Sequence, residues 1–460
     1  MQIQLSDHFS YGKLIRFTLP SIMMMIFTSI YSVVDGFFIS NYVGKTAFAS
    51  VNLIIPYLQI LGGMGAMLGV ALFVFGREFL SLFANGVGGS ALTAKTLGEG
   101  DIPQARKYFT MMVCLMAGVG VFFSVVGIIF LRPMAYVFGA TDNMIGDCML
   151  YGTTCLVFNT VLLMQYGFQS YLIVAEKPKL GLAVTVLAGL TNMVLDFLFM
   201  AVFKMGIFGA ALATGLSQCV GAVAPFAWFV SHQNTSALRF TKTKIELQPM
   251  LKACANGSSE MLSSVSGSIT GILYNLQLMK YAGEDGVAAY GVVMYAAFIF
   301  IGVYVGYSSG SSPIMGYHYG AQNHAEMKNV LKKSLILLGS AAVVLTGLAI
   351  LFARTLSSLF VGYDAELLEV TVHAFVICAI PFIFMWFNIY TSSFFTALND
   401  GAVSAAISFM RALVLPVICI LVMPVIWQLN GVWYSMVASE LLGLVVSLGF
   451  MLGNRKKYGY

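Results

Sequence analysis

The stretch PSIMMMIFTSIYSVVDGFFISNYVG (residues 20–44) is apolar over most of its length and carries one acidic residue, Asp35. A helix needs about 20 predominantly apolar residues to cross a bilayer, so this stretch predicts a transmembrane helix. A carboxylate in the bilayer core costs roughly 2.5–3.5 kcal/mol on insertion scales, so it is rarely there without a role. Three more acids lie in apolar stretches in the same way: Asp196, Glu260 and Glu440. Such acids usually bind a proton, a metal cation or a cationic substrate, which favours transport.

The composition points to a membrane protein throughout. Of the 460 residues, 59% are hydrophobic and 9% are charged, which excludes a soluble globular domain and a disordered chain. We predict an all-α integral membrane protein of 12 transmembrane helices with only short connections, and we expect the first helix to be retained rather than cleaved as a signal peptide. The predicted spans are 14–40, 48–70, 106–131, 145–172, 178–203 and 206–231, then 251–281, 286–319, 327–352, 367–398, 402–427 and 431–453.

The basic residues predict the orientation of these helices. Sixteen Lys and Arg residues lie at the termini and in the even-numbered loops, and five lie in the odd-numbered loops. By the positive-inside rule, both termini are cytoplasmic. The net charge of +5 is therefore a topology signal, and we expect no nucleic-acid partner. The seven cysteines fall mostly in apolar runs without ligand spacing, so we expect reduced packing residues.

The polar segment 232–250 divides the chain into similar halves. Gly98 aligns with Gly320 and Asp101 with Asn323. Two longer pairs of segments also match, 168–183 with 391–406 and 206–218 with 431–443. The prediction is an N-lobe of six helices (1–231), a cytoplasmic linker (232–250) and a C-lobe of six helices (251–460), with the substrate cavity between two pseudo-symmetric bundles.

One irregularity interrupts the repeat. The first half has about 18 more residues than the second between the second helix and Gly98, and the excess falls on ALFVFGREFLSLFANGV (71–87). Two interpretations stay open. The extra segment is either an elbow that the fold tolerates, or a duplication that disrupts helix two. We expect deletion of residues 71–87 to preserve or improve folding.

The stretch 20–44, the glycine turn before Asp101 and the NMVLD pattern (192–196) resemble the multidrug and toxic compound extrusion (MATE) family of bacteria. The resemblance implies a V-shaped fold with a central cavity and a monomeric antiporter of the bacterial plasma membrane. Such a protein exports organic, often cationic amphipathic compounds and drugs by alternating access, coupled to H⁺ or Na⁺, without another cofactor. It also implies a cation site at Asp35, Asn192, Asp196 and Thr214, and a coupling role for Glu260.

The residue chemistry allows either coupling ion. Asn192 and Asp196 are four residues apart and share one helix face. Two carboxylates, an amide and a hydroxyl offer the oxygens that Na⁺ prefers. Two close carboxylates also cannot both ionise cheaply, so one of them could carry H⁺. For each acid, a structural role as a hydrogen-bond partner stays open.

Further candidates lie on other helices. Arg411 and Glu440 can form a buried ion pair, and four polar or aromatic residues are candidate cavity residues: Gln165, Tyr166, Gln169 and Tyr390. The alternative function is a flippase or exporter of a lipid-linked or metabolite substrate in the same superfamily. A flippase for a pyrophosphate lipid needs a basic cavity, and the spans contain essentially one cation, Arg411. No metal or nucleophile constellation indicates an enzyme.

Overall fold

The computed structural model describes residues 3–43, 47, 50–51, 54, 58, 86–137, 140, 142–243, 246, 248–249, 258–362 and 365–460. The secondary structure of these residues is helical. The N-lobe contains α1 (Tyr11–Phe38), η1 (Ile39–Val43), α3 (Gly86–Gly98), α4 (Ile102–Val137), α5 (Ile145–Val157), α6 (Asn159–Val174), α7 (Pro178–Asp196), η3 (Phe197–Val202) and α8 (Gly206–Val230). The C-lobe contains α10 (Ser258–Gly320), α11 (His324–Leu351), α12 (Ala353–Val361), α13 (Ala365–Ala379), α14 (Phe382–Ala397), α15 (Gly401–Phe409), η4 (Met410–Val414), α16 (Leu415–Gly453) and α17 (Arg455–Tyr458).

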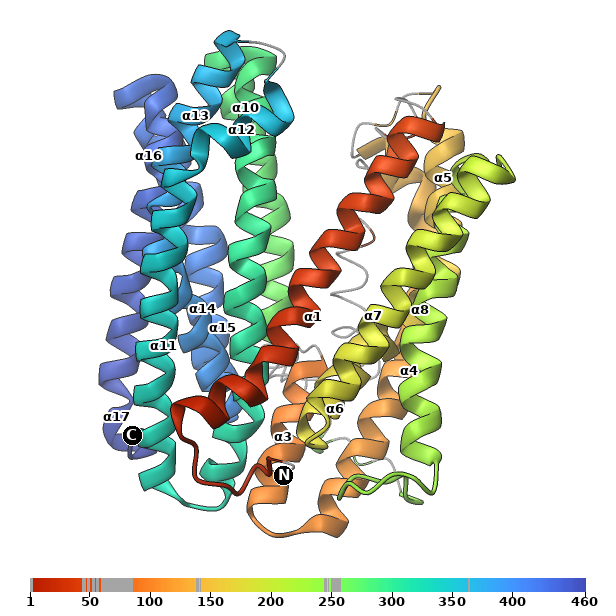
Figure 1. Cartoon of the computed structure of the whole chain (residues 1–460), viewed down its shortest axis with the longest axis vertical. Helices are drawn as coiled ribbons and strands as arrows, with labels where there is room; N and C mark the ends of the chain where they lie inside the picture. Colours follow the sequence, from red (N-terminus) through yellow and green to blue (C-terminus); the bar gives the residue numbers. More distant parts are fainter. Residues whose placement is uncertain are drawn as a thin grey trace.

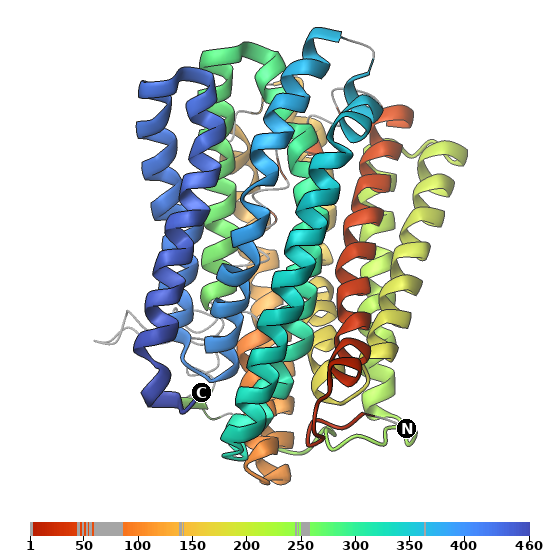
Figure 2. The same cartoon turned by 60° about the vertical axis from the view of Figure 1, so that its left-hand side comes forward.

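Most predicted spans are present as long apolar helices. Within the described residues, seven helices are long and apolar enough to cross a membrane, and two bent pairs bring the number to nine. Both α10 and α16 contain two helices that meet at a non-helical residue, Gly283 (φ 62°, ψ −149°) and Gln428 (φ 50°, ψ −129°). Figure 2 shows α10 turning over at its upper end. Most of the predicted second span (48–70) and residues 71–85 of the extra segment lie outside the described residues.

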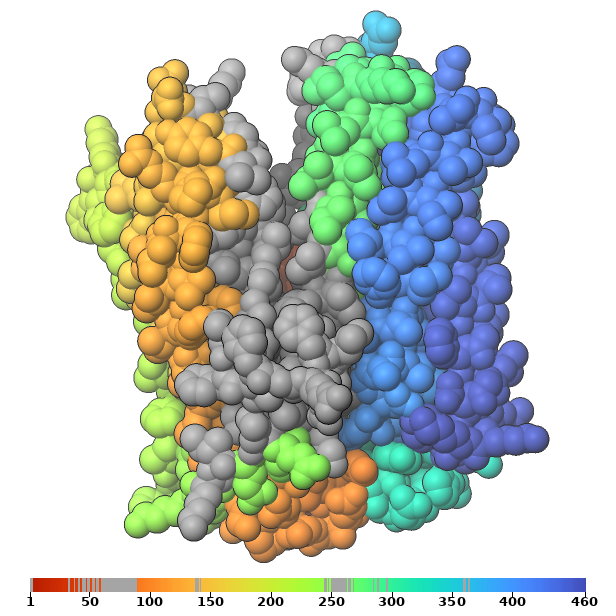
Figure 3. Space-filling model, turned by 180° about the vertical axis from the view of Figure 1, so that it is seen from behind, coloured from red at the N-terminus to blue at the C-terminus, as the bar shows by residue number. Residues whose placement is uncertain are grey.

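The two lobes converge at the end that carries both chain termini and diverge at the other end (Figure 1). Helix α1 runs obliquely between them and packs against both α7 and α10. In the space-filling view of the opposite face, the surface is hollowed between the lobes toward the upper end (Figure 3). The closed end therefore carries the termini, and the open end lies opposite.

Glycines make the closed end tight. Gly302, Gly306 and Gly310 are spaced by four residues on α10 and face α1, where a Cβ built on Gly306 would lie 2.6 Å from the Cα of Ile22. Where α3 meets α10, a Cβ on Gly98 would lie 2.0 Å from the carbonyl oxygen of Tyr317. Gly306 and Gly98 leave no space for a side chain, so the backbones of the two lobes touch at these positions.

The turns that end and begin equivalent helices confirm the similarity of the halves. Asp101 Oδ1 accepts the N–H of Gln104 at 3.0 Å, and the aligned residue Asn323 accepts the N–H of Glu326 through Oδ1 at 3.1 Å. Both side chains are N-caps, which satisfy free N–H groups at a helix start. Positive φ angles also recur at two aligned pairs of residues, Gly100 with Gln322 and Glu176 with Asn399.

The predicted spans 145–172 and 367–398 are each a bent pair of helices rather than one straight helix. The bend is 50° between α5 and α6 and 46° between α13 and α14. In the C-lobe, Pro381 lies at the bend and has no N–H for the helix ladder. In the N-lobe, Phe158 lies at the bend, and its ring fills the space beside Gly215, where an added Cβ would be 2.1 Å away.

The segment after α8 folds back on the N-lobe. Arg106 Nε on α4 donates to the carbonyl oxygen of Ala237 at 2.7 Å, and the N–H of Thr241 donates to Thr110 Oγ1 at 3.1 Å. The rings of Phe109 and Phe240 lie 4.9 Å apart. These contacts attach residues 232–243 of the linker to α4.

Candidate functional site

Helices α1 and α7 place two acids side by side in the N-lobe. Gly189 on α7 lets α1 approach closely, because a Cβ there would lie 2.4 Å from the ring of Phe27 and 2.9 Å from that of Tyr31. Asp196 follows Gly189 by seven residues on the same face of α7, and Asp35 follows Tyr31 by four on α1. The carboxyl groups of Asp35 and Asp196 are consequently neighbours.

Most oxygens at this place have no hydrogen-bond donor other than the neighbouring acid. Asn192 is 1% exposed and Asp196 is 0% exposed. Asp35 Oδ1, Asn192 Oδ1 and both carboxyl oxygens of Asp196 are buried, and none of them accepts a hydrogen bond from another kind of side chain or from the main chain. The two carboxyl groups lie within hydrogen-bond reach of each other, so either one can donate to the other when it is protonated. Thr214 lies on α8, which packs against α7, and its Oγ1 is also buried without a partner. Since buried polar atoms are almost always hydrogen-bonded, this group of oxygens requires an explanation.

The donor set fits a hard monovalent cation or a proton. The residues on α1 and α7 offer oxygens from two carboxylates and one amide, and hard cations prefer oxygen ligands. Within the described part of the chain, no group of three or more His, Cys, Asp or Glu side chains could hold a metal ion. Glu260 belongs to the first turn of α10, and its side chain lies outside the described residues.

The four candidate cavity residues have different surroundings. Gln169 Nε2 donates to Thr185 Oγ1 at 3.0 Å, and Gln165 packs 2.5 Å from the position of a Cβ on Gly221, so both lie between helices of the N-lobe. Tyr390 is 2% exposed in the C-lobe. Tyr166 is 50% exposed and is the one of these four residues with substantial exposed surface.

The C-lobe holds a paired acid. Arg411 Nη2 lies 3.1 Å from Glu440 Oε1, and Arg411 Nε donates to both carboxylate oxygens at 3.2 Å. Asn388 Nδ2 donates to Glu440 Oε2 at 2.8 Å. The side chains of Arg411 and Glu440 are 17% and 13% exposed. The charge of Glu440 is thus neutralised by a fixed partner.

Known proteins resemble this chain in sequence and in fold. A sequence profile described as MatE matches residues 20–198 and 261–421, which is more than half of the chain and includes both lobes. The chain belongs to the MatE family. It is thus a multi-pass membrane transporter, and the predicted family is confirmed. Among curated relatives, the multidrug export protein MepA of Staphylococcus saprophyticus is 20% identical over 457 residues, covering 95% of this chain and 93% of that protein.

Solved structures confirm the predicted fold class, with 12 helices in two lobes. An outward-facing multidrug resistance MATE transporter of the MOP superfamily matches with a TM-score of 0.87 and 20% identity, covering 98% of this chain and 97% of that one. A second MOP superfamily transporter, from Pyrococcus furiosus, matches with a TM-score of 0.86, 20% identity and the same coverage. It is described as having a binding pocket of reverse polarity that suggests a different function. At this identity the likeness concerns the fold alone.

Two features of the closed end are not among the residues that the sequence analysis identified. The first feature is the stripe of Gly302, Gly306 and Gly310. Its four-residue spacing is typical of small residues at helix interfaces, so a close helix contact was predictable from the sequence. Glu326 was also missed, and it acts at this end by accepting the N–H of Phe9, 317 residues earlier in the chain. No local pattern marks such a contact.

Proposed function

We propose that this chain exports organic, often cationic amphipathic compounds from a bacterial cell by cation-coupled alternating access. H⁺ or Na⁺ is the coupling ion and binds in the N-lobe at Asp35, Asn192, Asp196 and Thr214. The observation that carries the proposal is the set of buried oxygens on these residues that have no hydrogen-bond donor other than the neighbouring acid. The relatives described as multidrug export proteins support the substrate class.

The orientation follows from the basic residues. With the Lys- and Arg-rich loops and both termini in the cytoplasm, the closed end is cytoplasmic and the hollow between the lobes opens outward. In this state the cation enters from outside. The protein then carries it inward and returns with the organic compound.

Coupling requires the cation and the compound to favour opposite states. A ligand shifts a conformational equilibrium only through its different affinities for the two states. A cation or proton shared by Asp35 and Asp196 removes one negative charge from the pair of buried acids between α1 and α7. The repulsion between the two carboxyl groups then falls, so the packing of α1 against α7 changes. Because α1 also contacts α10, this change is passed to the contact between the lobes.

The alternative, a flippase or exporter of a lipid-linked or metabolite substrate, is less well supported. An anionic pyrophosphate headgroup requires unpaired positive charge inside the cleft. Arg411, the basic residue that the sequence places deep in a span, is paired with Glu440 at 3.1 Å. Its charge is therefore not free for an anion.

The decisive test is export of a cationic dye from efflux-deficient bacteria that express the parent or its Asp35→Asn variant at matched membrane levels. We expect lower dye accumulation with the parent and the empty-vector level with Asp35→Asn. A matched control is Glu369→Gln, an exposed acid of α13 that pairs with Arg354. If Asp35→Asn exports as well as the parent, the proposed coupling site is wrong.

The coupling ion is identified with purified protein in liposomes. A Na⁺ gradient and a pH gradient are imposed separately on the same preparation, and dye movement is followed for each. A response to one gradient that Asp196→Asn removes identifies the ion and the site together. Movement of a fluorescent lipid-linked anion, but not of the dye, would instead support the alternative.

A further inference from the structure

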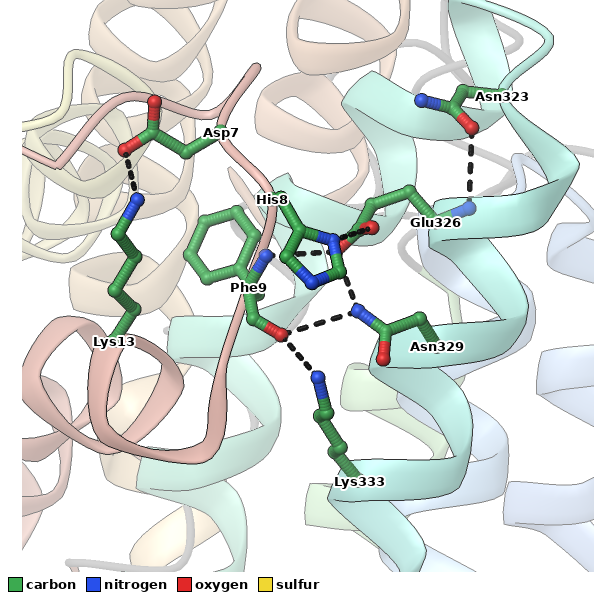
Figure 4. A network of polar contacts seen from close by, with 8 residues as sticks. All are labelled: Asp7, His8, Phe9, Lys13, Asn323, Glu326, Asn329 and Lys333. Carbon is green, nitrogen blue, oxygen red and sulfur yellow. Dashed lines mark hydrogen bonds and ion pairs between the residues drawn. The ribbon is translucent and has the colours of Figure 1, made fainter.

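The N-terminal strap, residues 3–10, crosses the closed end from one lobe to the other (Figures 1 and 4). It precedes α1, whose N-cap Ser10 accepts the N–H of Lys13 at 3.3 Å. Two of its side chains are fully or almost fully buried, with Leu5 at 2% exposure and Phe9 at 0%. The strap is therefore packed into the protein and is not a loose end.

An acid of each lobe holds one end of the strap. In the N-lobe, Glu176 in the turn between α6 and α7 accepts the N–H of Leu5 through Oε1 at 2.6 Å. In the C-lobe, Glu326 in the first turn of α11 accepts the N–H of Phe9 through Oε1 at 2.8 Å. The second carboxylate oxygen of Glu326 lies 2.6 Å from His8 Nδ1.

The C-lobe end has further contacts. Asn329 Nδ2 and Lys333 Nζ on α11 donate to the carbonyl oxygen of Phe9 at 3.1 and 2.6 Å (Figure 4). The ring of Phe9 packs edge-on against Phe17 of α1 and His318 of α10, with centroids 6.1 and 6.4 Å away. Phe9 is thus a wedge between α1, α10 and α11.

The short length of the strap links these contacts to lobe movement. Four residue steps separate Leu5 from Phe9, and an extended chain spans at most about 3.6 Å per residue, or about 14 Å here. When the closed ends of the lobes move apart, Glu176 and Glu326 move apart with them. A strap of this length cannot follow a large separation, so one end must be released first.

We propose that the strap is a latch that stabilises the state closed at the terminus-bearing end, with Glu176 and Glu326 as its two positioning residues. This inference rests on the alternating access of the proposed function but not on the coupling ion or the exported compound. Release of either end shifts the population toward the state open at that end, as expected for a contact made in only one of two states.

The test is a distance measurement between spin labels on the two lobes in the full-length protein. Lys179 on α7 and Lys328 on α11 are exposed at the closed end. Both are replaced by a non-natural amino acid that is labelled without thiol chemistry, because the native Cys114 is exposed. We expect one short distance in the parent and a second, longer population in Glu176→Ala and in Glu326→Ala.

Two further variants make the result specific. Glu326→Gln keeps an oxygen that accepts the N–H of Phe9, so it should restore most of the short distance. Glu369→Ala at the open end should leave the distribution unchanged. Unchanged distances in Glu176→Ala and Glu326→Ala overturn the latch, even if both variants are less stable to heat. A shift in Glu326→Ala alone also overturns the two-ended latch, because Phe9, next to the start of α1, would then join the lobes without the contact to Glu176.

The spin labels at positions 179 and 328 test the latch independently of the proposed function. The distances require no transported compound. If Asp35→Asn abolishes export while the latch variants keep the parent distances, the function stands and the latch falls. If the parent exports nothing, the distances still report whether the strap holds the lobes together.

Discussion

The two lobes are built on one repeat, yet they treat their buried acids in opposite ways. In the N-lobe, Asp196 is 0% exposed, and its carboxyl oxygens have no donor other than the neighbouring acid Asp35. In the C-lobe, Glu440 accepts hydrogen bonds from both Arg411 and Asn388. The repeat fixes where the helices lie, and a few substituted side chains decide whether a buried charge has a permanent partner.

This difference separates a structural charge from a charge available to a ligand. A paired acid keeps its charge through any transport cycle, because its neutralising cation is part of the protein. An unpaired buried acid is costly until a mobile cation or proton neutralises it. On this reasoning, we assign the coupling chemistry to the N-lobe and a fixed structural role to Arg411 and Glu440.

The largest expected effect is at Asp196. Asp196→Asn keeps the shape of the side chain and removes the charge, so the site loses affinity for a cation and can no longer carry a proton as a carboxylic acid does. We expect dye export to fall to the empty-vector level while the purified variant unfolds at the parent temperature or above. Export at the parent rate would place the coupling charge elsewhere.

The next effect concerns the C-lobe pair. Arg411→Ala leaves the carboxylate of Glu440 buried without its cation, and breaking such a pair costs about 3–5 kcal/mol. We expect a clear fall in the temperature of thermal unfolding in detergent, together with reduced expression. A loss of export without any loss of stability would contradict the structural role.

Replacing both partners refines that test. In the double variant Arg411→Met, Glu440→Met, no buried charge is left unpaired, and well-packed apolar replacements of an ion pair are often neutral. Asn388 Nδ2 also keeps an acceptor, because it donates to the main-chain oxygen of residue 440 at 3.1 Å. We expect the double variant to recover most of the stability and export that Arg411→Ala loses.

The closed end is where the lobes behave alike, and this gives a third prediction. A Cβ on Gly98 would lie 2.0 Å from the carbonyl oxygen of Tyr317, and a Cβ on Gly320 would lie 2.0 Å from that of Lys95. Overpacking costs about 1–3 kcal/mol, a factor of about 5–150 in the ratio of the two states. We expect Gly98→Ala and Gly320→Ala to lengthen the distance between labels at 179 and 328.

The control for this pair is a glycine with free space around it. Gly118 on α4 has no atom within 4 Å of the position that a Cβ would take, so Gly118→Ala should leave both the distance and export unchanged. If Gly98→Ala shifts the distance and Gly320→Ala does not, the closed end is less symmetric than the two matching clashes indicate.

Features that repeat or are locally encoded could be predicted from the sequence. Apolar length identified most helices, and the alignment of Asp101 with Asn323 correctly matched two N-caps. The ion pair of Arg411 and Glu440 was predictable, because an unpaired charge within a transmembrane helix is energetically unfavourable. The choice between H⁺ and Na⁺ was not accessible, since the same oxygens serve both ions.

The bend in the N-lobe and the strap were not predictable from local sequence, because they depend on contacts between residues that are distant in the chain. Pro381 could have signalled the bend between α13 and α14, but Phe158 bends the equivalent span without a proline, because Gly215 leaves room for its ring. Leu5 and Glu176 are 171 residues apart. Hydropathy windows examine about 20 residues at a time and detect neither contact.

The smallest expected effect concerns Asp400, in the turn before α15, outside the membrane spans. Burial alone raises the pKa of Asp400, but hydrogen bonds from Lys457, Tyr458 and the N–H of Val403 outweigh it and hold the pKa below its usual range. A carboxyl whose folded-state pKa is lowered stabilises the fold above its unfolded pKa of about 3.9 and loses that contribution as the pH falls through the folded value.

Asp400→Asn keeps an N-cap acceptor for α15 and removes the charge that Lys457 contacts. Because Lys457 is largely exposed, the loss at neutral pH should be about 0.2–1 kcal/mol. Thermal unfolding of parent and variant should differ at pH 7 and converge below about pH 4. In the repeat, Asp400 aligns with Lys177 of the N-lobe. The ammonium group of a lysine cannot accept a hydrogen bond, so the N-lobe turn has no equivalent of this N-cap, and the expected loss of stability concerns the C-lobe turn alone. A difference that persists in acid would mean that the charge of Asp400 is not its source.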